Sequence, residues 1–180
     1  GPVRVRMIRE ALINIATRGY VGIQSEIMIA GFIISGSSPR RVLIRGLGKS
    51  LEQRELSGVL EDPRLAIYDI EGQEVARVDD WKQEDNWEEI EQVSLLVGAA
   101  PLADPNESAI LVTLDPGLYT AHLSGQDGGT GIGLVEVFDA SSESIETRLV
   151  NISTRVKAAA GDEVAIGGFV ITGEDPKRVL

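Results

Sequence analysis

The last 31 residues of the chain repeat an early part of it. Ile13–Leu43 aligns without a gap on Val150–Leu180, at an offset of 137 residues. Fourteen of the 31 positions are identical, whereas ordinary composition would give roughly two. The second copy stops inside a segment with the pattern of a strand. We therefore expect one complete unit followed by the opening of another.

Alternating apolar residues predict many short β-strands. Ile110–Leu114 and Tyr119–Leu123 each place every second apolar side chain on one face, as a half-buried strand does. Asp115–Gly117 lies between them, with Pro and Gly where a type II turn needs them. The sequence therefore predicts two partner strands joined by a tight turn.

The sequence also predicts a β-hairpin and one helix. Glu71-Gly72 lies between the strand-like segments Leu65–Ile70 and Glu74–Val78, which predicts a β-hairpin. Trp87–Leu96 has apolar residues at helical spacing, and Asn86 precedes it as a candidate N-cap. We expect one short helix among the strands.

Many short strands punctuated by Gly, Pro and Asp indicate an all-β fold. We expect a jelly-roll-like antiparallel β-sandwich of about eight or nine strands, with a short helix and a partial second repeat. The expected boundaries are a leader strand over residues 1–11, the sandwich module over 12–147 and the partial repeat over 148–180. Aromatic residues are only 4%, so the core must consist mostly of Ile, Val, Leu and Ala.

Charge and residue types exclude several classes of function. The net charge is −11, which argues against binding nucleic acid or anionic membranes, because both need clustered Lys and Arg. The sequence has no Cys, so it has no disulfide framework and no thiolate metal site. The longest apolar run, Ile27–Ile34, is too short to span a bilayer. We expect no nucleic-acid partner and no membrane insertion.

The sequence contains no recognisable set of catalytic residues. His122 is the only histidine, and no Gly-x-Ser-x-Gly motif occurs; a catalytic His needs a nucleophile or carboxylate in fixed geometry. Gly46–Ser50 resembles the end of a phosphate-binding loop, but that motif needs a Gly where Leu43 stands. We expect a protein that is not an enzyme, has no catalytic residues and requires no cofactor.

An acidic segment around two tryptophans is the best ligand candidate. A solvated acidic loop is one interpretation of this segment. If Ca²⁺ binds here, we expect Asp79, Asp80 and Asp85 to hold it in a structural role, because this ion takes several carboxylate oxygens. Trp81 and Trp87 flank the same segment. They are candidates for stacking on a glycan, although packing in the core is the more usual role of Trp. Both alternatives stay open.

Several motifs follow one another along the chain: Asn14–Arg18, repeated at Asn151–Arg155, then Ile29–Gly36, Arg41–Gly48, Leu60–Pro63, Pro116–Tyr119 and Thr130–Phe138. Their order resembles a repeat module of large secreted bacterial surface proteins. The resemblance covers nearly the whole chain and implies an extracellular β-sandwich, used in tandem or at a C-terminus, with no established catalytic residues. More distantly, residues 65–138 resemble the jelly-roll domains that follow secreted peptidases. The acidic insertion over residues 82–91 departs from the pattern.

The partial repeat cannot bury its apolar residues by itself, because a two-stranded ribbon has no core. Its open backbone edges also invite pairing. It can fold onto its own unit, open a following unit of a longer protein, or insert into a neighbouring subunit and propagate a fibre. We expect self-association with identical or neighbouring modules through Val3, Val5 and Met7 at one end and Ile166, Phe169 and Ile171 at the other.

The expected function is therefore a non-catalytic structural module, extracellular or at the cell surface. It would assemble head to tail, in tandem or as a filament, by sharing β-strands. The alternative is a calcium-stabilised module of a secreted protein that binds carbohydrate or a surface.

Overall fold

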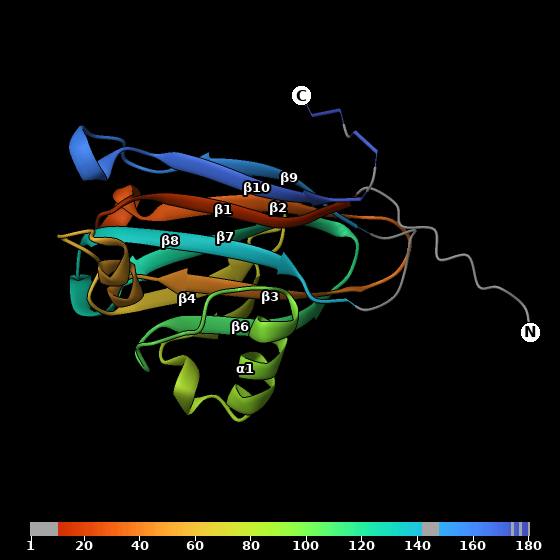
Figure 1. Ribbon diagram of the computed structural model, residues 1–180, viewed down its shortest axis with the longest axis horizontal. Helices are drawn as coiled ribbons and strands as arrows, with labels where there is room; N and C mark the ends of the chain where they lie inside the picture. Colours follow the sequence, from red (N-terminus) through yellow and green to blue (C-terminus); the bar gives the residue numbers. More distant parts are fainter. Residues whose placement is uncertain (1–10, 142–147, 174, 177, 180) are drawn as a thin grey trace, which may run out of the picture.

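The apolar strand faces of this sequence are buried by packing two sheets against each other. A computed structural model describes residues 11–141, 148–173, 175–176 and 178–179. Over these residues it is a mostly-β protein with two five-stranded antiparallel sheets, packed as a sandwich, and one short helix (Figure 1). The expectation of a β-sandwich with a short helix is confirmed.

Sheet A has the strand order β10-β1-β8-β3-β6, and sheet B has the order β5-β4-β7-β2-β9. The strands are β1 (Ala11–Val21), β2 (Met28–Ser35), β3 (Arg40–Leu47), β4 (Pro63–Tyr68), β5 (Glu74–Val78), β6 (Ser108–Leu114), β7 (Gly117–Gly125), β8 (Gly131–Asp139), β9 (Arg148–Arg155) and β10 (Ile166–Thr172).

Most connections between these strands cross from one sheet to the other. Among the described strands, β4 and β5 are the one pair adjacent in both sequence and sheet. They form the predicted hairpin, in which Gly72 has a φ of 79° that favours glycine. The prediction that Ile110–Leu114 and Tyr119–Leu123 are partners is wrong: β6 pairs with β3, and β7 pairs with β2 and β4. Both segments have an apolar face, and placing them in opposite sheets buries both faces.

The main core lies between the two sheets. Phe32 on β2 and Tyr119 on β7 stack with their ring centroids 5.7 Å apart, and both are buried. Side chains of this size contribute roughly 1.5–3 kcal/mol each when fully buried. The other buried residues of this cluster include Ile15, Ile34, Val42, Ile44, Leu65, Ile67, Ala121, Leu123, Val135 and Val137.

A second, smaller core lies under α1 (Trp87–Leu96), on the other face of sheet A. Ile90 and Val93 of the helix pack with Leu43 and Phe138. The helix has the predicted bounds, but Asn86 makes no capping hydrogen bond with its side chain. Its φ of −104° and ψ of 22° lie outside the extended region that an N-cap usually adopts.

A buried ion pair joins β3 to β8. The side chain of Arg45 is fully buried, and its Nη2 lies 2.6 Å from Oε2 of its cross-strand neighbour Glu136. Its Nη1 donates to the carbonyl of Ala100 at 2.6 Å. Because removing one partner of a buried pair leaves an uncompensated charge, this contact strongly disfavours any other register between β3 and β8.

Candidate functional site

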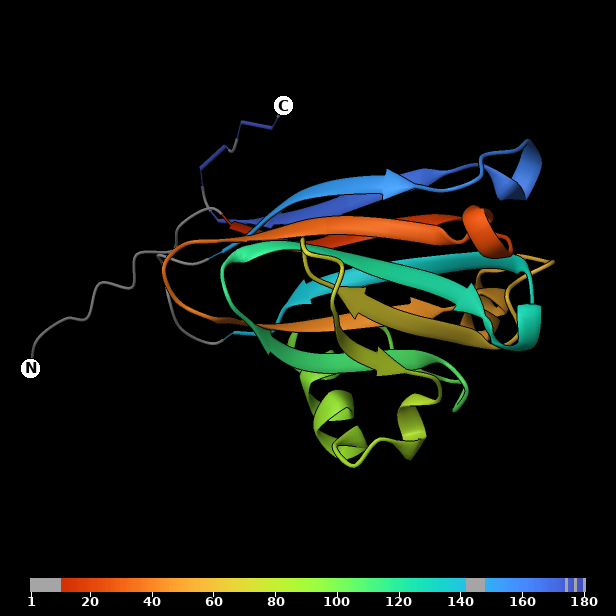
Figure 2. The same cartoon turned by 180° about the vertical axis from the view of Figure 1, so that it is seen from behind.

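The end of the chain pairs with the strands it repeats. We call β1, η1 (Gln24–Glu26) and β2 the first ribbon, and β9, η5 (Gly161–Glu163) and β10 the terminal ribbon. Strand β10 pairs with β1 in sheet A, and β9 pairs with β2 in sheet B. Figures 1 and 2 show the terminal ribbon, in blue, along one edge of the sandwich. Of the three outcomes considered above, the structure has the segment folded onto its own unit.

The two ribbons are related by an approximate two-fold symmetry. Ile15 lies opposite Phe169 in the β1–β10 pair, and Ile152 lies opposite Phe32 in the β2–β9 pair. The repeat offset converts one pair into the other. Each copy of the first strand therefore pairs with the other copy of the second strand. The register is the same except beside a bulge, where Val170 pairs with Asn14 but its equivalent Ile33 pairs with Val150.

Residues that are equivalent in the two copies meet where the ribbons cross. The hydroxyls of Thr17 and Thr154 are hydrogen-bonded at 2.7 Å, and these residues are 137 positions apart. Tyr20 and its equivalent Lys157 form a β-bridge, with Lys157 Nζ 5.7 Å from the Tyr20 ring centroid. Direct contact between equivalent residues is expected only near a symmetry axis.

A third equivalent pair, Gly19 and Val156, shows why the two copies differ in sequence there. A Cβ atom at position 19 would lie 2.6 Å from Cγ2 of Val156. Two valines cannot occupy the two sides of this contact, so glycine in one copy makes room for valine in the other. The packing of the terminal ribbon thus depends on this difference between the repeats.

The outer edge of the terminal ribbon is uncovered. Phe32 is 1% exposed in the first ribbon, whereas its equivalent Phe169 is 51% exposed. Ile166 and Val170 are also exposed, and Ile171 is half-buried. These residues include the three expected assembly residues of the C-terminal end. The other three expected assembly residues, Val3, Val5 and Met7, lie outside the described residues.

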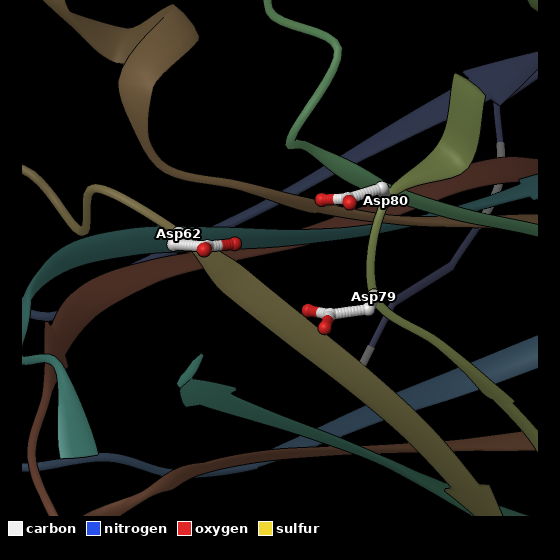
Figure 3. Close-up of side chains that lie close together, drawn as sticks. All are labelled: Asp62, Asp79 and Asp80. Atoms are coloured by element: carbon white, nitrogen blue, oxygen red, sulfur yellow. The ribbon is translucent and has the colours of Figure 1, made fainter. Parts of the chain in front are cut away.

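A cluster of three carboxylates lies at one end of sheet B (Figure 3). Asp62 directly precedes β4, and Asp79 and Asp80 directly follow β5. Because β4 and β5 are antiparallel, the start of one and the end of the other lie at the same end of the sheet. One oxygen from each of the three side chains lies within 4.8 Å of the others.

The three aspartates are partly buried and mutually repulsive. Burial raises the pKa of Asp62, and the charges of Asp79 and Asp80 raise it further. The pKa of Asp79 is also raised, first by burial and then by Asp80, with the nearby Arg64 acting in the opposite direction. Oδ1 of Asp62 and Oδ1 of Asp79 are both buried without a hydrogen-bond partner. Unpaired buried acceptors of this kind are costly unless a cation, a proton or water compensates them.

The donor set of this cluster fits Ca²⁺. This ion takes 6–8 oxygen ligands at about 2.3–2.6 Å in flexible geometry, so ligand oxygens up to about 5 Å apart can share one ion. Asp79 and Asp80 are two of the three residues expected from the sequence. The third, Asp85, is exposed and outside the cluster, and Asp62 takes its place. The sequence could have indicated Asp62, because it predicted the β4–β5 hairpin. In an antiparallel hairpin, the residues before the first strand and after the second lie at the same end of the sheet.

The two tryptophans lie in or beside the small core. Trp81 is 3% exposed, and its Nε1 donates to the carbonyl of Asp104 at 3.0 Å. Trp87 is half-buried and packs against the same cluster. The ammonium group of Lys82 lies 4.6 Å from the Trp81 ring centroid and 3.4 Å from that of Trp87. The ring face nearest Lys82 is therefore already in contact with a cation.

Two other candidates from the sequence, the loop Gly46–Ser50 and His122, contact other groups of the protein. Glu107 is fully buried, and its carboxylate accepts hydrogen bonds from the backbone amides of Gly48 and Ser50 at 2.7 and 2.6 Å. These amides belong to the loop that resembles a phosphate-binding loop, and the protein's own carboxylate fills it. His122 lies beside Tyr68, with ring centroids 4.5 Å apart. Burial, and then the charge of Arg155, lowers the pKa of His122.

No helix within the described ranges is long and apolar enough to cross a membrane. No protein-family model matches the chain, and no curated protein or solved structure matches it significantly.

Substituting Gly19 by alanine tests whether the terminal ribbon packs on the first in solution. We expect Gly19→Ala to lower the free energy of unfolding by about 1–3 kcal/mol, as overpacking does. In the Val156→Ala background the same change should be neutral or stabilising. Gly167→Ala is the matched control, because a Cβ there meets nothing within 4 Å. Equal losses with and without Val156, measured by urea unfolding, would contradict the packing.

Removing one carboxylate from the cluster should stabilise the protein when no divalent ion is present. Two charges 4 Å apart repel by about 1 kcal/mol even at the dielectric of water. Asp62→Asn should therefore raise the melting temperature at neutral pH by about 3 °C, whereas Asp85→Asn should not.

The advantage of Asp62→Asn should shrink as the pH falls. The folded-state pKa of Asp62 is raised above 3.8, so the folded wild type binds more protons than the unfolded chain between 3.8 and the raised value. Its stability therefore rises as the pH falls through this window. A melting-temperature difference that stays constant from pH 7 to pH 4 would contradict this electrostatic account.

Proposed function

We propose that this chain is a non-catalytic structural module, located outside the cell or on its surface. It joins identical or neighbouring units head to tail, in tandem or as a filament, by pairing β-strands at the outer edge of the terminal ribbon. The observation that supports this most directly is the exposed apolar row on that edge. Phe169 is exposed whereas its equivalent Phe32 is buried, and Ile166 and Val170 are exposed whereas their equivalents in the first ribbon are half-buried.

The sequence of the edge strands supports this proposal. Sheet edges are usually protected by charged residues or Pro, because unpaired backbone groups attract other strands. The edge strand β5 follows this rule, with Glu74 and Arg77 forming an exposed ion pair. The edge strand β10 (Ile166–Thr172) contains neither a charged residue nor Pro. The edge strand β6 (Ser108–Leu114) also lacks both, but its apolar side chains are buried or half-buried, whereas most of those on β10 are exposed. An edge with exposed apolar side chains and no charged residue is suited to strand addition.

We further propose that β1–β8 form a jelly roll. Without the terminal ribbon, the sheets have the orders β1-β8-β3-β6 and β5-β4-β7-β2. Two four-stranded sheets with repeated crossings between them are typical of this architecture. The resemblance of the motifs to secreted surface modules supports a location outside the cell.

Assembly should depend on the terminal ribbon. We expect chains refolded at rising concentration to form species of increasing mass in light scattering, and ladders or filaments in negative-stain microscopy. Phe169→Asp and, separately, Val170→Lys should leave monomers, because each places a charge on the pairing edge. Ile70→Asp is the control, since Ile70 is 68% exposed and lies away from that edge. Strict monomers of the wild type at every concentration would contradict the proposal.

A second candidate function is a calcium-stabilised module that binds a carbohydrate or a surface. The unpartnered, buried Oδ1 atoms of Asp62 and Asp79 favour it. We propose that Ca²⁺ binds to Asp62, Asp79 and Asp80 and has a structural role. A glycan-binding role would rest mainly on Trp87, because Trp81 is buried.

Calcium should stabilise the wild type through this cluster. At a concentration 100-fold above Kd, binding to the folded state adds about 2.7 kcal/mol, which raises the melting temperature by several degrees. EDTA should reverse the shift. Asp62→Asn and Asp79→Asn should lose the response, whereas Asp85→Asn should keep it. A wild-type melting temperature that is the same in calcium and in EDTA would contradict the proposed calcium site.

A further inference from the structure

We infer that the partner of the terminal ribbon is a second copy of this unit, which offers its β8 to β9 and its β7 to β10. This inference rests on the proposed assembly and specifies its geometry. It predicts which strands meet, in which register, and which segment of the second copy must move.

The pairing of the first ribbon defines what the terminal ribbon can bind. Strand β1 pairs with β10 on one side and with β8 on the other, and β2 pairs with β9 on one side and with β7 on the other. The terminal ribbon repeats these strands and has already formed the inner half of the pattern, in the same register except beside the bulge. Its outer edges therefore lack the equivalents of β8 and β7.

The apolar side chains of the terminal ribbon resemble those of the first ribbon that lie opposite β7 and β8. Phe32 lies opposite Tyr119 in the β2–β7 pair, so Phe169 would lie opposite Tyr119 of the second copy. Ile152 would likewise lie opposite Val137 of the second copy, as Ile15 does within the chain. The apolar pairs that are identical between the ribbons include Ile15 and Ile152, Ile29 and Ile166, Phe32 and Phe169, and Ile34 and Ile171.

In a second copy, the required edges of β7 and β8 are already paired with its own first ribbon. Docking between two chains is therefore an exchange, in which the terminal ribbon of one chain replaces the first ribbon of the next. The donor and acceptor surfaces differ, so the contact is head to tail and can propagate.

Within its own chain, the first ribbon has two advantages over the terminal ribbon of another chain. It is covalently attached, which gives it a high effective concentration. Its side chains are also larger at two buried positions, where Val21 and Met28 align with Ala158 and Ala165 of the terminal ribbon. Folded chains should therefore exchange slowly, whereas chains refolded together at high concentration should form exchanged pairs.

Single-cysteine variants can detect the predicted register, because this sequence has no Cys. Val170 is the equivalent of Ile33, which lies opposite Leu118 in the β2–β7 pair. Val170 and Leu118 are both exposed, so each tolerates substitution. We would refold Val170→Cys together with Leu118→Cys at high concentration, add a short bifunctional thiol reagent, and identify the linked peptides by mass spectrometry.

We expect dimers linked between positions 170 and 118, at least 10-fold more abundant than when the two variants are refolded separately and then mixed. Val170→Cys refolded with Ile70→Cys is the matched control and should give background linkage, because Ile70 is exposed but lies away from the predicted contact.

The alternative results separate this inference from the proposed assembly. Linkage between two copies of Val170→Cys alone would indicate a closed, edge-to-edge dimer of terminal ribbons. It would overturn the exchange while leaving assembly through this edge intact. Monomers under all conditions would overturn both proposals.

Discussion

The crossing of the chain between two sheets is the constraint on which the rest of this structure depends. Because consecutive strands other than β4 and β5 lie in opposite sheets, neither sheet can form without the other. The order of the strands is then determined by contacts between distant segments. The buried Arg45–Glu136 pair is one such contact and joins the central strands β3 and β8. A fold dominated by distant contacts is expected to form slowly, which gives concentrated chains time to exchange equivalent segments.

The same constraint explains why the terminal repeat adds one strand to each sheet. A copy of a ribbon that spans both sheets can pair with its original only by spanning both sheets itself. The contacts at Thr17–Thr154 and Gly19–Val156 show that the two copies fit each other around an approximate two-fold axis. This arrangement leaves Ile152 and Val156 partly buried against the core and leaves the other side of the ribbon exposed, with Phe169 as its largest exposed apolar side chain. The unit therefore ends in two adjacent strand edges, which together can position a partner more firmly than a single edge.

The polar sites of the protein differ in how their charges are compensated. Glu107 is buried, but two backbone amides donate hydrogen bonds to its carboxylate. The carboxylate therefore stabilises the loop that follows β3. Asp62 and Asp79 are less buried, yet each has an oxygen without a partner. Backbone amides supply the compensation in the first case, whereas no protein group supplies it in the second, which leaves it to a cation, a proton or water. This contrast is the physical reason for regarding the aspartate cluster, rather than Glu107, as the candidate ligand site.

The sequence by itself determined the strands, the β4–β5 hairpin, the helix Trp87–Leu96 and the internal repeat, because period, turn residues and identity are local or directly readable. It also indicated Asp79 and Asp80 as ligand candidates. Only the tertiary structure decided that β6 and β7 lie in opposite sheets, that Trp81 is buried, and that Asp62 completes the cluster in place of Asp85. It also decided that the terminal ribbon pairs with the first. These features depend on which distant strands become neighbours, and that choice is made by burying apolar faces and pairing backbone edges across the whole molecule.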